Sequence, residues 1–298
     1  MKFGKVNNPE TVDFTLPDDH PETARVLKEQ GDKKNKPEIY IGCAKWNRSD
    51  LKGFYPRGTK DELEYYSRQF NSIELNATFY RPYGPDQYEK WTAKTPSDFK
   101  FFPKLNQEIS HWKRLKDAEE VTENVVNATL ALEGQLGMMF LQLRDDFKPK
   151  DIDRIEGFLK DFPKNAPLAV EVRNDEWFKE PVATEIYNML EAYNTTNIIV
   201  DTAGRRDMLH MRLTTPYAFV RYVGANITSD YTRLEEWVDK LEDWTEKGIK
   251  GIYFFIHQNI EKESPLLAAH FIEKLNKRLG TSIKVPERPD DKSGKLDL

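Results

Sequence analysis

The chain has 298 residues, more than a typical single domain, although barrels of alternating strands and helices often reach this size undivided. Its 45 basic and 50 acidic residues give a net charge of −5, which argues against a nucleic-acid binder that depends on an overall positive field, while a local basic cleft stays open as an alternative. Cys43 is the single cysteine, so an internal disulfide and a cysteine-based zinc cluster are excluded. With no apolar run near the ~20 residues of a membrane-spanning helix, we expect a soluble, cytoplasmic protein.

Two polar regions flank a longer patterned segment, so three regions are predicted. Residues 1–37 are polar and lysine-containing, and we expect an N-terminal extension that packs on the exterior of the main domain or is partly disordered. Residues 38–282 form the main domain. Residues 283–298 form a tail rich in Pro, Asp and Lys, which we expect to be solvated.

Eight strand-like runs follow one another through the main domain, most of them followed by a helical pattern. The predicted strands cover residues 39–44, 72–77, 99–104, 137–143, 168–173, 197–201, 218–223 and 251–257. The predicted helices cover residues 60–70, 85–94, 118–133, 150–162, 181–193, 229–247 and 264–279. Ser264 is expected to cap the last helix ahead of Pro265, and the sixth connection, 202–216, is too short and polar to predict a helix.

This alternation predicts an α/β fold, an eight-stranded parallel (β/α)8 barrel of the TIM type that need not be regular throughout. A doubly wound open sheet is the alternative. The sequence lacks a Gly-x-Gly-x-x-Gly turn after the first strand, which counts against that alternative.

Polar side chains gather near the carboxyl ends of the predicted strands, on the face opposite the helices. In the second strand, apolar residues 73, 75 and 77 alternate with the polar Glu74 and Asn76. The later strands add Lys104, Gln142, Glu171, Arg173, Asp201, Arg221 and His257. Because active sites of such barrels lie at that end, these groups predict a shared, water-accessible ligand site.

A closed ionic network is the alternative interpretation of the same pattern. Its acids and bases would balance three against three: Glu74, Glu171 and Asp201 against Lys104, Arg173 and Arg221. Buried ion pairs rarely improve stability over apolar packing, so a ligand site is the favoured interpretation.

Ordered motifs extend from the first strand to the last helix. The most specific is Glu-Leu-Asn-Ala-Thr-Phe-Tyr-Arg at 74–81, preceded by Gly-Cys-Ala-Lys-Trp at 42–46 and Phe-Tyr-Pro at 54–56, and followed by Ala-Val-Glu-Val-Arg at 169–173 and Phe-Val-Arg at 219–221. With these motifs, residues 39–279 resemble the YecE-like family, known as domain of unknown function 72. The resemblance implies an eight-stranded barrel and gives no secure activity.

The chain departs from the family pattern at several positions of the predicted rim. Lys45 replaces a glycine before Trp46, and Arg144 and Asp145 replace prolines after the fourth strand. Asn174 and Val223 stand where the family often has histidines. The loss of two imidazoles weakens any mechanism in which those histidines ligate metal or carry protons.

The charged groups suit an anion better than a metal. The chain has five histidines, too few for a trinuclear zinc site with this geometry, although one Mg²⁺ or Mn²⁺ held by Glu74, Glu171 and Asp201 stays open as an alternative. Lys104, Arg173 and Arg221, with Lys45, would repel a cation and favour a phosphate or carboxylate. No cofactor is predicted.

We therefore predict an enzyme that acts on a small phosphorylated or carboxylated metabolite, a sugar or a nucleotide. Glu74 and Glu171 are the acid–base candidates, Lys104 an electrostatic stabiliser or, less favoured, a Schiff-base nucleophile, and Asp201 and His257 orient groups or relay protons. The predicted ligand contacts are Lys45, Trp46, Asn76, Tyr80, His111, Gln142, Arg173 and Arg221. Loop aromatics at 46, 79, 80, 112 and 177 are expected to stack on a sugar or base.

Two other classes remain as alternatives. By analogy with endonuclease-type barrels, the protein could bind or process nucleic acid, against which its net acidity counts. It could also be a non-catalytic sensor that captures an anion. The oligomeric state is left open.

Overall fold

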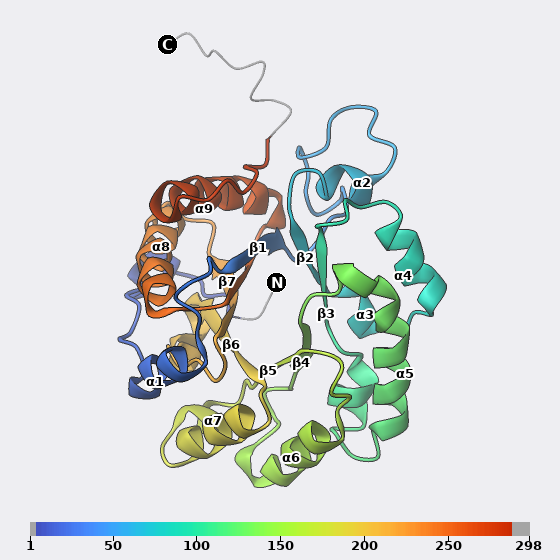
Figure 1. Cartoon of the computed structure of the whole chain (residues 1–298). Coiled ribbons are helices and arrows are strands. Elements are labelled where there is room, and N and C mark those ends of the chain that lie inside the picture. The colour runs from blue at the N-terminus through green and yellow to red at the C-terminus, as the bar shows by residue number, and fades with distance from the viewer. Residues whose placement is uncertain (1–3, 288–298) are drawn as a thin grey trace.

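The computed structural model describes residues 4–287 and places eight parallel strands in one sheet, in the order β3-β2-β1-β8-β7-β6-β5-β4. The strands are β1 Glu38–Cys43, β2 Ser72–Leu75, β3 Lys100–Pro103, β4 Met139–Gln142, β5 Leu168–Glu171, β6 Thr196–Thr202, β7 Tyr217–Gly224 and β8 Gly251–Gln258. At the ends of this order, β3 and β4 are joined by two isolated bridges, which pair Phe101 with Leu136 and Lys104 with Phe140. The sheet thus curls into a nearly closed barrel, which confirms the predicted fold (Figure 1).

Helices surround this barrel on the outside (Figure 1). The α-helices are α1 Pro21–Gln30, α2 Glu62–Tyr66, α3 Ala77–Tyr80, α4 Pro85–Thr92, α5 Glu119–Thr129, α6 Ile152–Asp161, α7 Val182–Ala192, α8 Ser229–Lys247 and α9 Ser264–Leu279. The other helical segments are the π-helix η2 Glu108–Trp112 and the 3-10 helices η1 Pro9–Thr11, η3 Leu130–Gln135, η4 Pro149–Asp151, η5 Asp175–Phe178, η6 Ala203–Met208 and η7 Glu261–Glu263. None of the helices formed by residues 4–287 combines the length and apolar composition that a membrane crossing requires.

The prediction that Ser264 caps the last helix is wrong. Ser264 is the first residue of α9, and Glu263 occupies the cap position without a side-chain cap. The Ser264 hydroxyl instead donates to Glu261 (2.8 Å), a residue of the short helix η7 that leads into α9. The preceding turn therefore takes the hydroxyl that the sequence pattern assigned to the helix end.

Strand alternation separates the core into an interior and an exterior part. Alternate residues of the strands meet inside the barrel as one apolar cluster, which contains Phe102, Met138, Phe140, Ala169, Ile198, Val200, Phe219, Tyr253 and Phe255. The intervening residues pack outward against the helices, as Ile73 and Leu75 do in β2 and Ile199 does in β6. A side chain two residues beyond a member of the inner cluster therefore points into the barrel, toward its carboxyl end.

The N-terminal segment supplies a helix that the sixth strand–helix unit lacks. Within the described residues, the connection between β6 and β7 contains η6 and no α-helix. In Figure 1, α1 lies between α7 and α8, where that helix would stand. Thr23, Val26 and Leu27 are the buried residues of α1, so its inner face belongs to the core of the barrel domain. The residues of the predicted extension that α1 contains thus pack on the exterior of the barrel.

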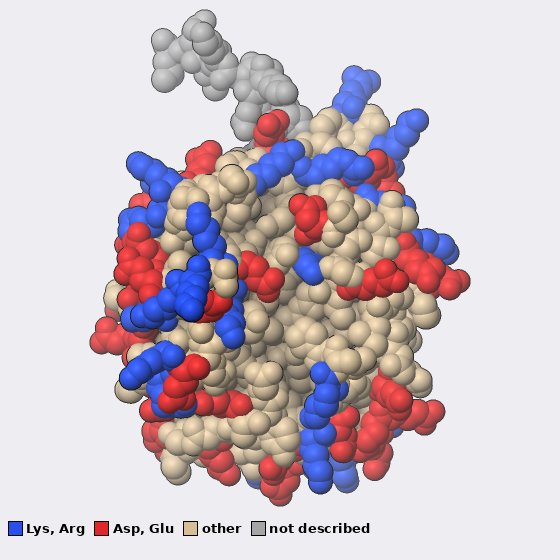
Figure 2. Space-filling view, viewed as in Figure 1, with Lys and Arg blue, Asp and Glu red and all other residues tan. Residues whose placement is uncertain are grey.

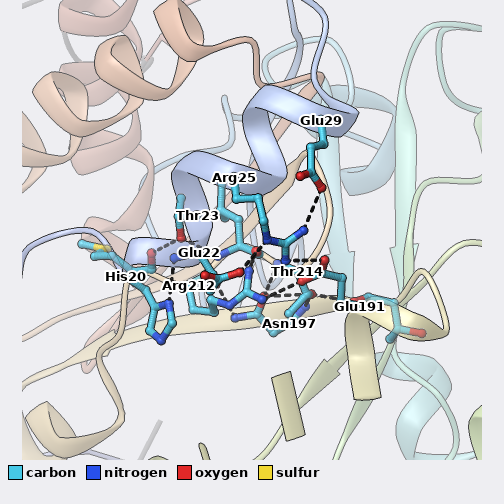
Figure 3. A network of polar contacts seen from close by, with 12 residues as sticks. His20, Glu22, Thr23, Arg25, Glu29, Glu191, Asn197, Arg212 and Thr214 are labelled. Atoms are coloured by element: carbon cyan, nitrogen blue, oxygen red, sulfur yellow. Dashed lines mark hydrogen bonds and ion pairs between the residues drawn. The ribbon is translucent and has the colours of Figure 1, made fainter. Parts of the chain in front are cut away.

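A polar network fastens α1 to the barrel (Figure 3). The hydroxyl of Thr23 donates to the carbonyl of Met211 (2.6 Å) and accepts from the amide of Leu213 (3.0 Å). Arg25 of α1 and Arg212 of the β6–β7 connection both pair with Glu191 of α7, each at 2.6 Å. Glu191 therefore joins three segments that are distant in the sequence.

Replacement of Glu191 by alanine is expected to lower the free energy of unfolding by about 3 kcal/mol, because it leaves the guanidinium of Arg212 buried without its carboxylate. Urea unfolding followed by circular dichroism measures the loss. Glu29→Ala is the matched control, since Glu29 also pairs with Arg25 but is exposed, and it should cost less than about 1 kcal/mol. Equal losses in the two variants would contradict this account of the network.

The first residues of the predicted tail pack against the domain. Ile283 and Val285 contact the apolar core, and Lys284 donates to the carbonyl of Arg68 (2.6 Å). The amide of Glu287 donates to the Gln69 side chain (3.1 Å). The prediction of a solvated tail is therefore wrong for residues 283–287, and its remainder, 288–298, lies outside the described residues.

Candidate functional site

A layer of polar side chains lies above the inner apolar cluster, at the carboxyl ends of the strands. Each of its members except Glu74 stands two residues beyond a residue of that cluster, and Glu74 lies between the outward-facing Ile73 and Leu75. The members are Glu74, Lys104, Gln142, Glu171, Arg221 and His257. Six strands thus bring together six of the predicted site residues. They are at most 7% exposed, so the predicted water-accessible site is not open at this level.

Arg221 is the centre of this layer. Its guanidinium makes two parallel hydrogen bonds to the carboxylate of Glu74, both 2.9 Å, and a third of 2.5 Å to Glu171. Glu171 also accepts from Arg173 (2.5 Å). Two carboxylates and two guanidiniums therefore neutralise one another in a Glu–Arg lattice formed by Glu74, Glu171, Arg173 and Arg221. The predicted ionic network forms in part, and Arg221, a predicted ligand contact, is occupied by the protein itself.

The carboxylate of Glu74 receives two further contacts. Asn76 donates its side-chain amide to one oxygen (2.7 Å), and the Nε2 atom of His257 lies 3.0 Å from the other. The Nδ1 atom of His257 is buried and has no hydrogen-bond partner. A buried polar atom without a partner is unusual and marks a place where a bound group could contribute one.

The pKa values of the two glutamates argue against the predicted acid–base role. Burial by itself would raise the pKa of Glu74, but its contacts with Arg221 and His257 outweigh burial and hold the pKa well below its usual value. Burial would also raise the pKa of Glu171, but Arg173 and Arg221 outweigh burial and lower this pKa to about 2. Both carboxylates are ionised at neutral pH and are poor bases, so their contacts assign them to holding the cations in place.

Lys104 differs from the other cations of the layer, because it has no carboxylate partner within salt-bridge distance among the described residues. Its Nζ atom donates to Gln142 (2.7 Å) and lies 4.0 Å from the ring centre of Phe79. Burial, followed by repulsion from Arg221 and Arg173, lowers the pKa of Lys104 to about 7. Its amino group is therefore divided between the charged and neutral forms at physiological pH.

His111 lies near Lys104 toward the rim, and the charges of Arg173 and of Arg144, which pairs with Asp146 (3.1 Å), act on it. The ring of His111 contacts that of Phe79 edge to face, with centres 4.8 Å apart. Burial and the charges of Lys104, Arg144 and Arg173 lower the pKa of His111 to about 4, so this imidazole is neutral at pH 7. Arg144 was noted in the sequence only as a departure from the family pattern, although it follows the end of the fourth strand as the other rim residues follow theirs.

A cavity of about 540 Å³ borders this part of the rim. It is lined by Asp145, Asp146, Lys148, Arg173, Asn174, Asp175 and Arg205. Arg173 therefore connects the buried Glu–Arg lattice with an outer space large enough for a small ligand.

Asp201 does not belong to this layer, so its predicted place in the site is wrong. It has the strand parity of Ile199 and faces the helices, where it accepts from Arg206 and from Arg233 and Trp237 of α8. The inner face of β6 carries Thr202 at the corresponding level. Because β6 is buried on both faces, its apolar pattern did not reveal which face Asp201 occupies.

The single metal ion considered in the sequence analysis would have used Asp201. With Asp201 on the outer face and the other two carboxylates paired with arginine, that set of three ligands does not form. Across residues 4–287, no group of three or more His, Cys, Asp and Glu side chains is arranged to hold a metal ion.

The remaining predicted contacts lie at the edge of the site or outside it. Lys45 pairs with Asp50 (3.2 Å), and the Trp46 ring packs on that of Trp91 with centres 5.9 Å apart. Tyr80 is 70% exposed beside Phe79 and remains available at the rim. The predicted aromatic cluster is incomplete, because Trp177 is fully buried and donates to the carbonyl of Phe147, away from the polar layer.

Comparison with known proteins identifies the family. Residues 40–292 match the family model described as protein of unknown function DUF72. The UPF0759 protein YecE of Escherichia coli (strain K12) is 26% identical over 278 residues, covering 86% of this chain and 99% of that protein. The UPF0759 protein YunF of Bacillus subtilis (strain 168) is 27% identical over 173 residues, covering 55% of this chain and 60% of that protein.

Two solved structures of DUF72 family proteins share the fold of this chain. The crystal structure of a DUF72 family protein from Thermotoga maritima MSB8 superimposes with a TM-score of 0.65 at 26% identity, covering 80% of this chain and 99% of that one. A DUF72 family protein from Enterococcus faecalis V583 superimposes with a TM-score of 0.63 at 18% identity, covering 84% of this chain and 98% of that one. The chain therefore belongs to the DUF72 family, described as proteins of unknown function.

Proposed function

We propose that the protein is an enzyme that acts on a small metabolite carrying a phosphate or a carboxylate, bound at the carboxyl end of the barrel. The observation that carries this proposal is the position of Lys104. The two carboxylates and two guanidiniums of the Glu–Arg lattice cancel in charge, so a protonated Lys104 is a surplus buried cation. An uncompensated cation in a desolvated site favours an anion beside it.

The distribution of charge on the surface argues against the nucleic-acid alternative. On the face shown in Figure 2, acidic and basic side chains are interspersed around a hollow whose walls are mostly uncharged. The net charge of −5 points the same way, because non-specific nucleic-acid binding depends on a concentrated positive field.

The first test is ligand-induced stabilisation. Phosphorylated and carboxylated metabolites should raise the melting temperature of the wild-type protein, by an amount equivalent to about 2.7 kcal/mol at a hundredfold excess over Kd. Lys104→Met should abolish the shift. Lys94→Met is the matched control and should retain it, since Lys94 is an exposed lysine that pairs with Asp61.

The pH dependence gives a second measurement on the same samples. If the anion binds beside charged Lys104, affinity should fall as the pH rises through about 7, because the free amine loses its proton there. Affinity that is unchanged between pH 6 and pH 9 would contradict the proposal. Conversion of the stabilising compound, followed by mass spectrometry, separates an enzyme from an anion sensor.

A further inference from the structure

The amino group of Lys104 is held by few contacts, none of which is to a carboxylate among the described residues. The described residues hold it with one hydrogen bond, to the side-chain oxygen of Gln142, and with the face of the Phe79 ring. An ammonium group has three N–H donors, so this arrangement satisfies one of them directly. The amide fixes the direction of the amine without supplying a negative charge that would keep it protonated.

The charges around Lys104 come from several elements. Arg221 of β7 and Arg173 after β5 repel its charged form, whereas Glu171 of β5 and Glu74 of β2 attract it less strongly. Both glutamates are already bound to the two arginines. The lattice thus presents its cationic side to the lysine, as required of a lysine that is to act as a neutral amine.

We infer that Lys104 is a nucleophile that forms an imine with the carbonyl carbon of an aldehyde or ketone whose phosphate or carboxylate is held beside it by Arg173 at the rim. This inference rests on the proposed function and specifies its substrate class. The covalent bond to the substrate would form at Lys104, the residue that directly follows β3.

The step balances without an oxidant or a reductant. The lone pair on Nζ forms a bond to the carbonyl carbon, the C=O π bond breaks, and a proton passes from nitrogen to the new alkoxide to give a carbinolamine. The nitrogen lone pair then forms the C=N bond as the C–O bond breaks, the departing hydroxyl takes up a proton and leaves as water, and the nitrogen gives up its second proton to replace the one consumed. The sum is one amine and one carbonyl giving one imine and one water.

The protonation state of Lys104 agrees with this geometry. With a pKa of about 7, about half of the amine is neutral at pH 7, whereas an ordinary lysine is neutral in less than about one molecule in a thousand. A neutral amine is the form that attacks a carbonyl, so Lys104 should react ahead of the surface lysines despite being largely buried.

Limited reductive methylation tests the nucleophile independently of the natural substrate. The wild-type protein is treated with a small amount of formaldehyde and cyanoborohydride, which traps imines, and every lysine is mapped by peptide mass spectrometry. At pH 7, Lys104 should react about tenfold faster than exposed lysines such as Lys148, whose pKa is raised by Glu176. Its rate should level off above about pH 7, whereas the rates of surface lysines continue to rise. Slower methylation of Lys104 than of Lys148 at pH 7 would overturn the inference.

Trapping with charged ketones tests the substrate class. Dihydroxyacetone phosphate, pyruvate and uncharged acetone are each added with cyanoborohydride, and the expected adduct on Lys104 has the mass of the ketone less one oxygen atom. Dihydroxyacetone phosphate or pyruvate should label Lys104 at least about tenfold faster than acetone does, and the faster of the two identifies the anionic group. Labelling by acetone at the same rate would refute the claim that the rim binds the anionic group of the substrate. Lys104→Arg, which keeps the charge but forms no imine, should give no adduct at that position.

The two proposals fail in different ways. If dihydroxyacetone phosphate or pyruvate raises the melting temperature but leaves Lys104 unlabelled under cyanoborohydride, the imine is refuted and the anion site stands. If Lys104 is labelled no faster than exposed lysines and neither compound shifts the melting temperature, both proposals are refuted.

Discussion

Replacement of Arg221 by methionine is expected to lower the free energy of unfolding at pH 7 by about 3–5 kcal/mol. The guanidinium is almost fully buried and binds Glu74 through two hydrogen bonds and Glu171 through a third. Methionine fills much of the space but leaves Glu74 without its arginine in the barrel interior. The loss is comparable with the total stability of many domains, so little folded protein should remain at moderate urea concentrations.

The pH dependence distinguishes an orphaned carboxylate from a simple packing defect. In the wild-type protein, the pKa values of Glu74 and Glu171 are lower than in the unfolded chain. Their contribution to the free energy of unfolding is therefore complete above about pH 4.5 and is lost as the pH falls toward 2. In the variant, only His257 and Asn76 still stabilise the charged carboxylate of Glu74, and we expect burial to outweigh them and raise its pKa above the unfolded value. The variant should therefore gain stability as the pH is lowered from 7 to 5, while the wild type hardly changes.

Urea unfolding at pH 7 and pH 5 measures both effects. Arg48→Met is the matched control, because Arg48 pairs with Glu62 at the surface, and its cost should stay below about 1 kcal/mol at either pH. A loss in Arg221→Met that is the same at both pH values would show that the unpaired carboxylates are not its cause.

Deletion of residues 1–31 is expected to prevent stable folding of the barrel. The deletion removes α1, including the buried Val26 and Leu27, each of which contributes about 1.5–3 kcal/mol. It also removes Thr23, whose hydroxyl makes hydrogen bonds with the backbone of Met211 and Leu213 in the β6–β7 connection. Arg25, which pairs with Glu191, is lost as well. Together these losses reach about 5 kcal/mol or more, which equals the lower range of domain stability.

The truncated chain should be insoluble or should lack a cooperative melting transition, as measured by circular dichroism and size-exclusion chromatography. A synthetic peptide of residues 1–31, added during refolding, should restore the transition. Within the full chain, Leu27→Ala should cost about 2–5 kcal/mol and Lys28→Ala, on the exposed face of α1, less than about 0.5 kcal/mol. A truncated protein that melts at the wild-type temperature would show that α1 is dispensable for the barrel.

Strand periodicity was sufficient to predict most of the polar layer. In β7 and β8, a single polar residue follows bulky apolar ones of the same parity, so Arg221 and His257 could be placed inside the barrel from the sequence. In β6, Ile198, Ile199 and Val200 place apolar side chains on both faces directly before Asp201, so the pattern could not distinguish the faces. The signal that could have corrected this lies in α8, where Arg233 and Trp237 are four residues apart and form one polar site on an otherwise buried face.

Pairing within the layer could not be predicted, because it depends on side-chain geometry rather than on strand position. The sequence placed Arg221 at the site but did not indicate that Glu74 would accept hydrogen bonds from both the Nε and the Nη2 atoms of its guanidinium. The location of α1 on the barrel also could not be predicted from a local sequence pattern. Its contacts are made to Met211 and Glu191, and no periodicity within residues 21–30 identifies those partners.

The placement of α1 has a consequence for the order of assembly. The hydrogen bond between Thr23 and Met211 spans 188 residues, so α1 leaves the ribosome long before the segment that it covers has been made. During that interval its apolar face has no native partner, and closure of so long a loop is entropically slow. We therefore expect the gap between α7 and α8 to be among the last parts of the domain to close, although the helix that fills it is the first α-helix of the described chain.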